Sequence, residues 1–257
     1  MHDRPRKPRA RIFGLVSIVF FSIIGVTAAG WFGYSGLTWM HYGSPQAGVQ
    51  PNVALDHFMP VYEVDEQQDL AVGAPWTNTF AAECLMDLQN SAVIHAVIED
   101  RARILGATPD PQASGEPSAF VAQAISYGWG VLAEDPGHEI ILGAVSQPWE
   151  QNVAFQSLPP DEFASYQSAG YAKIVWTLDA EPTGPSTSIA RTVTRVETTD
   201  PDSRDKFRSY WAKISPGMAL IRSQALALVR ADAEQSYQAN GEAAPTTCEA
   251  IESAAGH

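Results

Sequence analysis

Residues 171–198 read YAKIVWTLDAEPTGPSTSIARTVTRVET, and this stretch predicts the hairpin around which the rest of the fold is organised. Apolar and polar side chains alternate along 171–181, and 187–198 is a Thr- and Val-rich run of similar length. Both patterns are typical of β-strands. The Pro-Thr-Gly-Pro segment at 182–185 supplies a turn between them. We expect these two strands to form the longest hairpin of an antiparallel sheet.

A long helix is predicted directly after this hairpin. Asp200 is a suitable N-cap, and Pro201 suits the first helical position. Pro216-Gly217 is expected to kink the helix or to split it in two. Residues 235–257 contain no Lys or Arg and are rich in small and acidic residues, so they are predicted to be a disordered tail. An apolar stripe at steps of three and four residues marks the buried face of the helix: Phe207, Trp211, Ile214, Met218, Ile221, Ala225 and Leu228.

The chain before the hairpin predicts further strands and two short helices. Helices are expected over 76–89 and 92–105, the second between a capping Ser91 and a terminating Gly106. Pro136-Gly137 separates two apolar runs and predicts another hairpin. Residues 119–127 fit either a strand or a helical turn. The remaining predicted strands are 61–72, 129–133, 139–146 and 152–158, which brings the total to six.

The N-terminal region carries a membrane signal. Residues 12–32 contain no charged side chain, and 21 helical residues span about 30 Å, the thickness of a bilayer core. Five basic residues within 1–11 precede this run, and aromatic residues follow it. We therefore expect a basic cytoplasmic tail, one transmembrane helix over 12–32, a linker over 33–59, and a domain on the extracytoplasmic (periplasmic) side of the inner or plasma membrane. The alternative is a secretory signal cleaved near residues 26–29.

Composition limits the classes of partner. About 180 residues are left for a single domain after anchor, linker and tail are set aside. The net charge is −13, although the first eleven residues carry five of the sixteen basic residues. Such an acidic domain is not expected to bind nucleic acid, nor to adhere to anionic lipid apart from its basic tail. Export permits a disulfide between Cys84 and Cys248, but the interpretation favoured is a buried Cys84 and a lone tail thiol.

The predicted elements form an α+β arrangement of one strand, two short helices, a run of antiparallel strands and a long C-terminal helix. This order resembles the helix-grip fold of the START-like (SRPBCC) superfamily. This superfamily includes polyketide cyclases and lipid-transport domains. The resemblance covers about residues 60–234, with about six to seven strands expected to curve around the last helix. Three segments carry it: MPVYEVDEQQDLAVGAPWTNTFAAE at 59–83, GWGVLAEDPGHEIILGAV at 128–145, and the hairpin from 171 running into the last helix as DPDSRDKFRSYW at 200–211.

The resemblance implies a cavity for a hydrophobic ligand between the sheet and the last helix. The superfamily has no universal catalytic motif, so it implies no catalytic residue here. Large aromatic side chains and two Arg residues in the last strand are the candidates for contact with a ligand, although the aromatic residues could equally form ordinary core and the Arg residues a solvated outer face. The candidate ligand-binding residues are Trp129, Trp149, Trp176, Arg191, Arg195, Trp211 and Met218.

Other polar residues give weaker signals. Glu83 and Asp87 lie four residues apart on the first short helix, which indicates a solvated face. The sequence has no Cys/His cluster for a metal, and Gly128-Trp129-Gly130 lacks the following helix that a dinucleotide site requires. No cofactor or metal is therefore expected.

The function predicted is a membrane-anchored, non-catalytic binding domain for a small hydrophobic molecule or lipid. One alternative is a cyclase or dehydratase, with Arg191, Arg195, Glu197, Tyr171 and His95 as candidate polar groups. A second alternative is a protein that binds another component of the envelope. The sequence leaves the oligomeric state and the ligand open.

Overall fold

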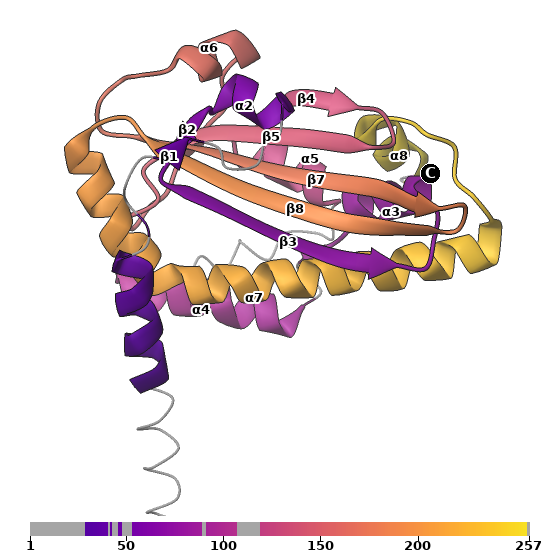
Figure 1. Ribbon diagram of the computed structural model, residues 1–257, viewed down its shortest axis with the longest axis horizontal. Helices are drawn as coiled ribbons and strands as arrows, with labels where there is room; N and C mark the ends of the chain where they lie inside the picture. Colours follow the sequence, from indigo (N-terminus) through magenta and orange to yellow (C-terminus); the bar gives the residue numbers. More distant parts are fainter. Residues whose placement is uncertain are drawn as a thin grey trace, which may run out of the picture.

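The computed structural model describes residues 29–40, 42, 46–47, 53–88, 91–106 and 119–255. Residues 29–40 form a helix, called helix 29–40 below, that leaves the domain beside α7 and α4 (Figure 1). The other helices and strands are β1 (Gln46–Ala47), α2 (Val53–Phe58), β2 (Val61–Tyr62), β3 (Val64–Val72), α3 (Trp76–Leu85), α4 (Ala92–Leu105), α5 (Phe120–Ser126), β4 (Gly130–Asp135), β5 (Glu139–Ser146), β6 (Phe155–Gln156), α6 (Pro160–Ser165), β7 (Ala172–Gly184), β8 (Thr187–Thr198), α7 (Pro201–Asn240) and α8 (Cys248–Ala255).

The main sheet has six antiparallel strands, ordered β3-β8-β7-β5-β4, with β6 paired to β5 beyond the end of β4. The hairpin expected at 171–198 is confirmed as β7 and β8, the two longest strands. The Pro136-Gly137 hairpin is confirmed as β4 and β5, and Gly137 adopts a φ of 79°, which a glycine reaches without a steric cost. The undecided segment 119–127 is helical, as α5.

Helix α7 runs along one face of the sheet and bends partway along its length (Figure 1). Asp200 caps it as predicted, because its carboxylate accepts hydrogen bonds from the backbone N–H and the hydroxyl of Ser203 and from the N–H of Gly170. These bonds hold the pKa of Asp200 well below its ordinary value. The helix continues through Pro216, so it is kinked rather than split in two.

The core lies on both faces of the sheet. The larger cluster fills the space between the sheet and α7, α3 and α5. A second cluster covers one end of the opposite face, where α2 and α6 bring Leu55, Phe58 and Phe163 onto Val175 and Val193. The expectation of a solvated second face is therefore wrong at this end of the sheet. Within the segment predicted as a linker, 33–59, the side chains of Leu55, Phe58 and Met59 are buried in the domain.

The prediction of a disordered tail at 235–257 is also wrong for the residues of this segment that the structure describes. Helix α7 continues to Asn240, and α8 follows it. Cys248 forms a disulfide with Cys84 of α3, so the interpretation of two unpaired thiols is also wrong. The side chain of Asn78 holds the connecting segment, since it donates to the carbonyl of Gly241 and accepts from the N–H of Ala243. These contacts give the tail a fixed position despite its polar composition.

The predicted basic tail at 1–11 and residues 12–28 of the predicted transmembrane helix lie outside the described residues. Residues 29–32 are helical and belong to helix 29–40. None of the helices within the described ranges combines the length and the hydropathy that a membrane span requires.

Candidate functional site

The resemblance implies a ligand in the interior of the grip. Among the described residues, a void of about 10 Å³ lies between the sheet and α7, which is at most the space of one water molecule. Trp176 of β7 fills much of this interior: its ring meets Phe120 at a centroid distance of 4.6 Å, and its Nε1 donates to Thr192 Oγ1. The void is lined by Glu83, Met86, Trp176, Leu178, Thr192, Ala225, Leu226 and Val229.

Glu83 is the one ionisable side chain that lines this void. It is fully buried, and neither carboxyl oxygen has a hydrogen-bond partner among the described residues. Burial raises the pKa of Glu83 well above its ordinary value of 4.5, and the charge of Asp179 raises it further. Burial without a partner therefore favours the neutral form of this carboxyl group. The predicted solvated face of α3 is wrong at this residue, because α3 lies between the sheet, α7 and α8 instead of at the surface.

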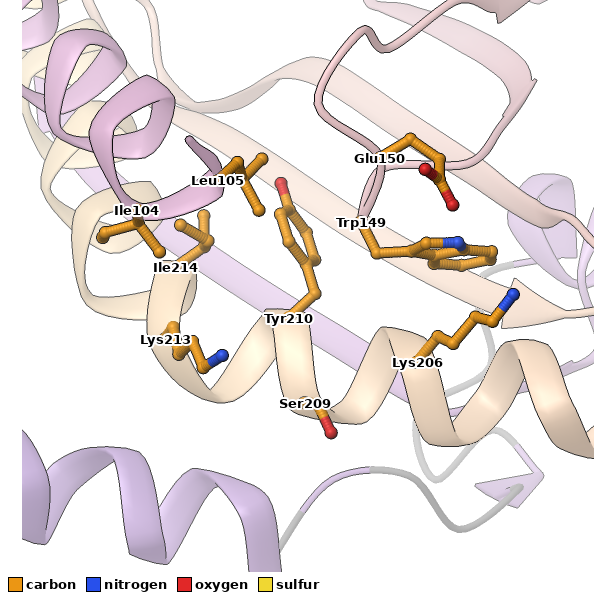
Figure 2. A pocket seen from close by; sticks show the side chains of 9 residues that line it. All are labelled: Ile104, Leu105, Trp149, Glu150, Lys206, Ser209, Tyr210, Lys213 and Ile214. Atoms are coloured by element: carbon orange, nitrogen blue, oxygen red, sulfur yellow. The ribbon is translucent and has the colours of Figure 1, made fainter. Parts of the chain in front are cut away.

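A larger cleft of about 310 Å³ lies between α4 and α7 and beside the loop that follows β5. Ile104 and Leu105 at the end of α4 form one wall, and Trp149 stands on the other side of Tyr210 (Figure 2). Nine residues line the cleft: Ile104, Leu105, Trp149, Glu150, Lys206, Ser209, Tyr210, Lys213 and Ile214.

Two features of the cleft suit a ligand with an apolar body and a polar end. Ile104, Leu105 and Ile214 give the cleft an apolar wall, and the indole ring of Trp149, whose Nε1 is buried without a hydrogen-bond partner among the described residues, is also part of its lining. Lys206 and Lys213 lie one either side of Tyr210 along α7, and both are exposed (Figure 2). They place positive charge at the rim, where a carboxylate or phosphate would be stabilised.

The wall of the cleft is held by Arg101 of α4. Its guanidinium donates to the carbonyl of Pro148 at 3.2 Å and to the hydroxyl of Tyr210 at 3.4 Å, and it lies over the Tyr210 ring. Arg101 thus connects α4 to α7 and to the loop that follows β5, which are the other two segments that form the cleft.

The seven ligand-binding candidates from the sequence do not meet at one place. Trp149 lines the cleft, whereas Trp176 lines the small interior void. Trp129 packs against the ring of Trp176. Trp149, Trp211 and Met218 meet at a third apolar cluster under the first half of α7, where Trp211 stacks on Phe207. Leu105, Tyr210 and the two rim lysines were not among the candidates, because no periodic pattern links segments so far apart in sequence.

Arg191 and Arg195 lie together on the face of the sheet opposite α7, as their spacing predicts, but in different surroundings. Arg191 is partly exposed and pairs with Asp69, Asp179 and Glu181. The Arg195 side chain is only 2% exposed, because α2 covers it, and it pairs with Asp56 at 2.6 Å. The solvated position expected for Arg195 is therefore wrong, and both side chains are engaged in ion pairs away from the cleft.

The polar groups proposed for an enzyme do not converge either. Glu197 pairs with Lys173 on the face opposite α7, Tyr171 packs against the apolar cluster there, and His95 is exposed on α4. Among the described residues, no group of three or more His, Cys, Asp or Glu side chains is placed to hold a metal ion.

No protein-family model matches the chain, and no curated protein matches it in sequence. Among solved structures, it is similar to the two-domain aromatase/cyclase BexL of the BE-7585A biosynthetic pathway, with 15% identity over 67% of this chain and a TM-score of 0.31. The chain covers 47% of BexL, so it spans about half the length of that relative.

Two further solved structures are also similar. Norcoclaurine synthase from Thalictrum flavum is 9% identical, with 77% of this chain and 98% of the other covered and a TM-score of 0.31. The ZhuI aromatase/cyclase from Streptomyces sp. R1128 is 13% identical, with 70% and 99% covered and a TM-score of 0.25. Likenesses at this level do not assign the chain to a family or to an activity.

Proposed function

We propose that this protein is a membrane-tethered, non-catalytic binding domain that holds a small amphiphilic molecule in the cleft between α4 and α7. The observation that carries the proposal is the cleft itself. Its volume of about 310 Å³ is at the lower end of the range for small-molecule sites, and its walls are mostly apolar. The interior void of about 10 Å³ is too small for such a molecule, so the binding site lies outside the grip.

The lining defines the class of ligand. Ile104, Leu105 and Ile214 offer an apolar wall for a short acyl chain or a ring. Lys206 and Lys213 at the rim favour an anionic end. A fatty acid or a comparable amphiphile has both an apolar body and an anionic end.

Membership of the START-like superfamily is part of this proposal. The supporting features are the six-stranded antiparallel sheet and the long C-terminal helix that covers it. A cyclase role would need at least two ionisable groups that converge in a cavity. Glu83 is the one such group in the lining of the interior void, whereas Glu150, Lys206, Tyr210 and Lys213 line the cleft. We assign the two exposed lysines to ligand binding, and propose binding rather than catalysis for the cleft.

The tether and the compartment are proposed from the sequence and the disulfide together. The uncharged run 12–32 behind five basic residues favours a single-pass helix with the N-terminus in the cytoplasm. The disulfide between Cys84 and Cys248 supports an oxidising, extracytoplasmic location for the domain, because such bonds are rare in reducing compartments.

A pair of matched variants tests the binding site. Ile104 is 44% exposed and lines the cleft, whereas Ile125 of α5 is 48% exposed and does not line it. Replacing either by Asp should leave the fold intact, because neither side chain is buried. We expect Ile104→Asp to weaken binding of the fluorescent fatty acid cis-parinaric acid by about tenfold, because an Ile contact of about 1.4 kcal/mol is lost. Ile125→Asp should bind like the wild type.

Titration of the purified full-length protein, with emission as the readout, gives the comparison. Equal affinities for the two variants would place the ligand elsewhere. A wild-type protein that binds no fatty acid would remove the proposal altogether.

A further inference from the structure

Helix 29–40 exposes an unusual amount of apolar surface. Four of its twelve residues are aromatic, and it contains no charged side chain. Large apolar side chains are rarely exposed in such density on a water-facing helix, and such patches mark interaction surfaces. The exposed ones are Trp31, Phe32, Tyr34, Leu37, Trp39 and Met40.

The helix is nevertheless fixed to the domain at its C-terminal end. The Arg208 guanidinium lies 3.9 Å from the ring centre of Trp39 and donates to the Trp39 carbonyl. Thr38 is buried, and the ring of Tyr42 meets Trp211 edge to face. Through these contacts, the position of helix 29–40 is coupled to the first half of α7.

A run of the sequence with basic but no acidic residues begins in that half of α7, although the protein as a whole is acidic. Residues 206–231 contain five basic residues and no Asp or Glu, although the chain as a whole carries a net charge of −13. Lys206, Lys213 and Arg230 of this run are exposed. Lys206 and Lys213 lie with Ser209 and Leu220 on one stripe along the helix at helical spacing, and Arg230 lies about a quarter turn farther around the helix. We call these five residues the outer stripe of α7.

Helix 29–40 meets the first half of α7, which carries Lys206, Ser209 and Lys213 of the outer stripe. Figure 1 shows helix 29–40 projecting from the layer formed by α7 and α4, away from the sheet and roughly across the direction of α7. If helix 29–40 enters a bilayer end-on, α7 lies along the surface of that bilayer, and the outer stripe is at the level of the lipid headgroups.

We propose that helix 29–40 and the outer stripe of α7 form a docking surface for a bilayer that contains anionic lipid. Aromatic side chains are favoured at the interface between lipid and water, and Lys and Arg are attracted to anionic headgroups. The composition of the whole chain hides this basic run, because its acidic residues lie outside residues 206–231. Lys206, Ser209 and Lys213 also line the cleft, but docking to the bilayer needs no ligand in it.

The absence of free thiols makes a direct test practical. The two cysteines of the chain form the disulfide, so a cysteine introduced at Ser209 can be labelled alone. Ser209 lies between Lys206 and Lys213 and is exposed, whereas Ser186 is exposed in the β7–β8 turn, outside α7, and serves as the matched control. The full-length Ser209→Cys and Ser186→Cys proteins, each carrying a fluorophore, are reconstituted in vesicles that contain a headgroup-linked nitroxide quencher.

Vesicles of phosphatidylcholine alone are compared with vesicles that also contain phosphatidylglycerol. We expect quenching at position 209 to exceed quenching at position 186, to increase with phosphatidylglycerol, and to fall when salt shortens the Debye length from about 8 Å to about 3 Å. The triple variant Lys206→Gln/Lys213→Gln/Arg230→Gln should lower the ratio of docked to undocked domain by about fivefold per charge removed. Arg191→Gln, which removes one positive charge from the opposite face, should leave that ratio unchanged.

Equal quenching at 209 and 186, or quenching at 209 that ignores phosphatidylglycerol and salt, would overturn the proposal. The wild-type comparison of the two lipid compositions needs no charge variant, so it decides the matter even if the triple variant fails to fold. A surface meant for a protein partner would leave position 209 unquenched in both lipids, which also overturns the proposal.

Discussion

Cys84 in α3 forms a disulfide with Cys248 in α8, across a separation of 164 residues. The N–H of Cys248 also donates to the Glu134 carboxylate of β4 at 2.6 Å. The last helix of the chain is thereby fastened over α3, next to the buried carboxyl group of Glu83. The end of the chain thus closes one end of the core.

Removal of this disulfide should destabilise the domain. The bond closes a very long loop, and the chain-entropy relation predicts a loss of about 3 to 5 kcal/mol in the free energy of unfolding. Urea denaturation of the Cys84→Ala/Cys248→Ala double variant should show a lower midpoint than the wild type. A reductant should lower the wild-type midpoint and leave that of the double variant unchanged. If reductant leaves the wild type as stable as before, the disulfide does not hold the tail in solution.

Glu83 should make the stability of the domain fall as the pH rises. Its pKa in the folded state lies well above the ordinary 4.5, so the folded protein binds the proton more tightly than the unfolded chain does. The contribution is complete below pH 4.5 and is lost as the pH rises toward the folded pKa, at about 1.4 kcal/mol per pH unit. Glu83→Gln keeps the shape of the neutral acid and cannot ionise.

Denaturation of both proteins across this pH range measures the difference. We expect the wild type to lose stability relative to Glu83→Gln as the pH increases. Parallel pH profiles for the two proteins would show that Glu83 is already ionised in the folded state, or that it is not buried.

Arg195 and Arg191 provide a matched pair on one strand and one face. The Arg195 side chain is 2% exposed and that of Arg191 is 27% exposed. Arg195→Ala should cost about 3 kcal/mol or more, because it leaves Asp56 and Asp65 without their buried partner. Arg191→Ala should cost less than about 1 kcal/mol, because water screens its pairs. Thermal denaturation of the two variants checks the order, and equal losses would mean that α2 does not cover Arg195 in solution.

Much of the fold is predictable from local patterns. The alternation in 171–198 fixes the central hairpin, and Asp200 with Pro201 fixes the start of α7, because turn and cap residues act on their immediate neighbours. The second apolar cluster, on the face of the sheet opposite α7, is harder to predict from the sequence. Leu55 and Phe58 occupy a short helix inside a Gly- and Pro-rich region, so composition indicates a linker although their burial makes them core.

The candidate site is harder to predict, for a physical reason. Ile104, Trp149 and Tyr210 come from three segments that meet only in the folded chain, and none of the segments carries a motif of its own. Glu83 misleads in a similar way, because its spacing to Asp87 suits a surface helix, whereas in the folded chain Glu83 is buried beside residues of the sheet and α7. The basic run 206–231 can be recognised in the sequence itself, but the net charge of −13 for the whole chain gives no sign of it.

Photo-cross-linking tests the central claim, that the ligand lies in the cleft between α4 and α7. The full-length protein in vesicles is irradiated with a diazirine-bearing fatty acid, with and without an excess of the unreactive fatty acid, and the labelled peptides are identified by mass spectrometry. The account predicts labels that the competitor removes at residues 104–105, 149–150 and 206–214. Competed labels at Trp176, Leu226 and Val229, which line the interior void, would contradict it.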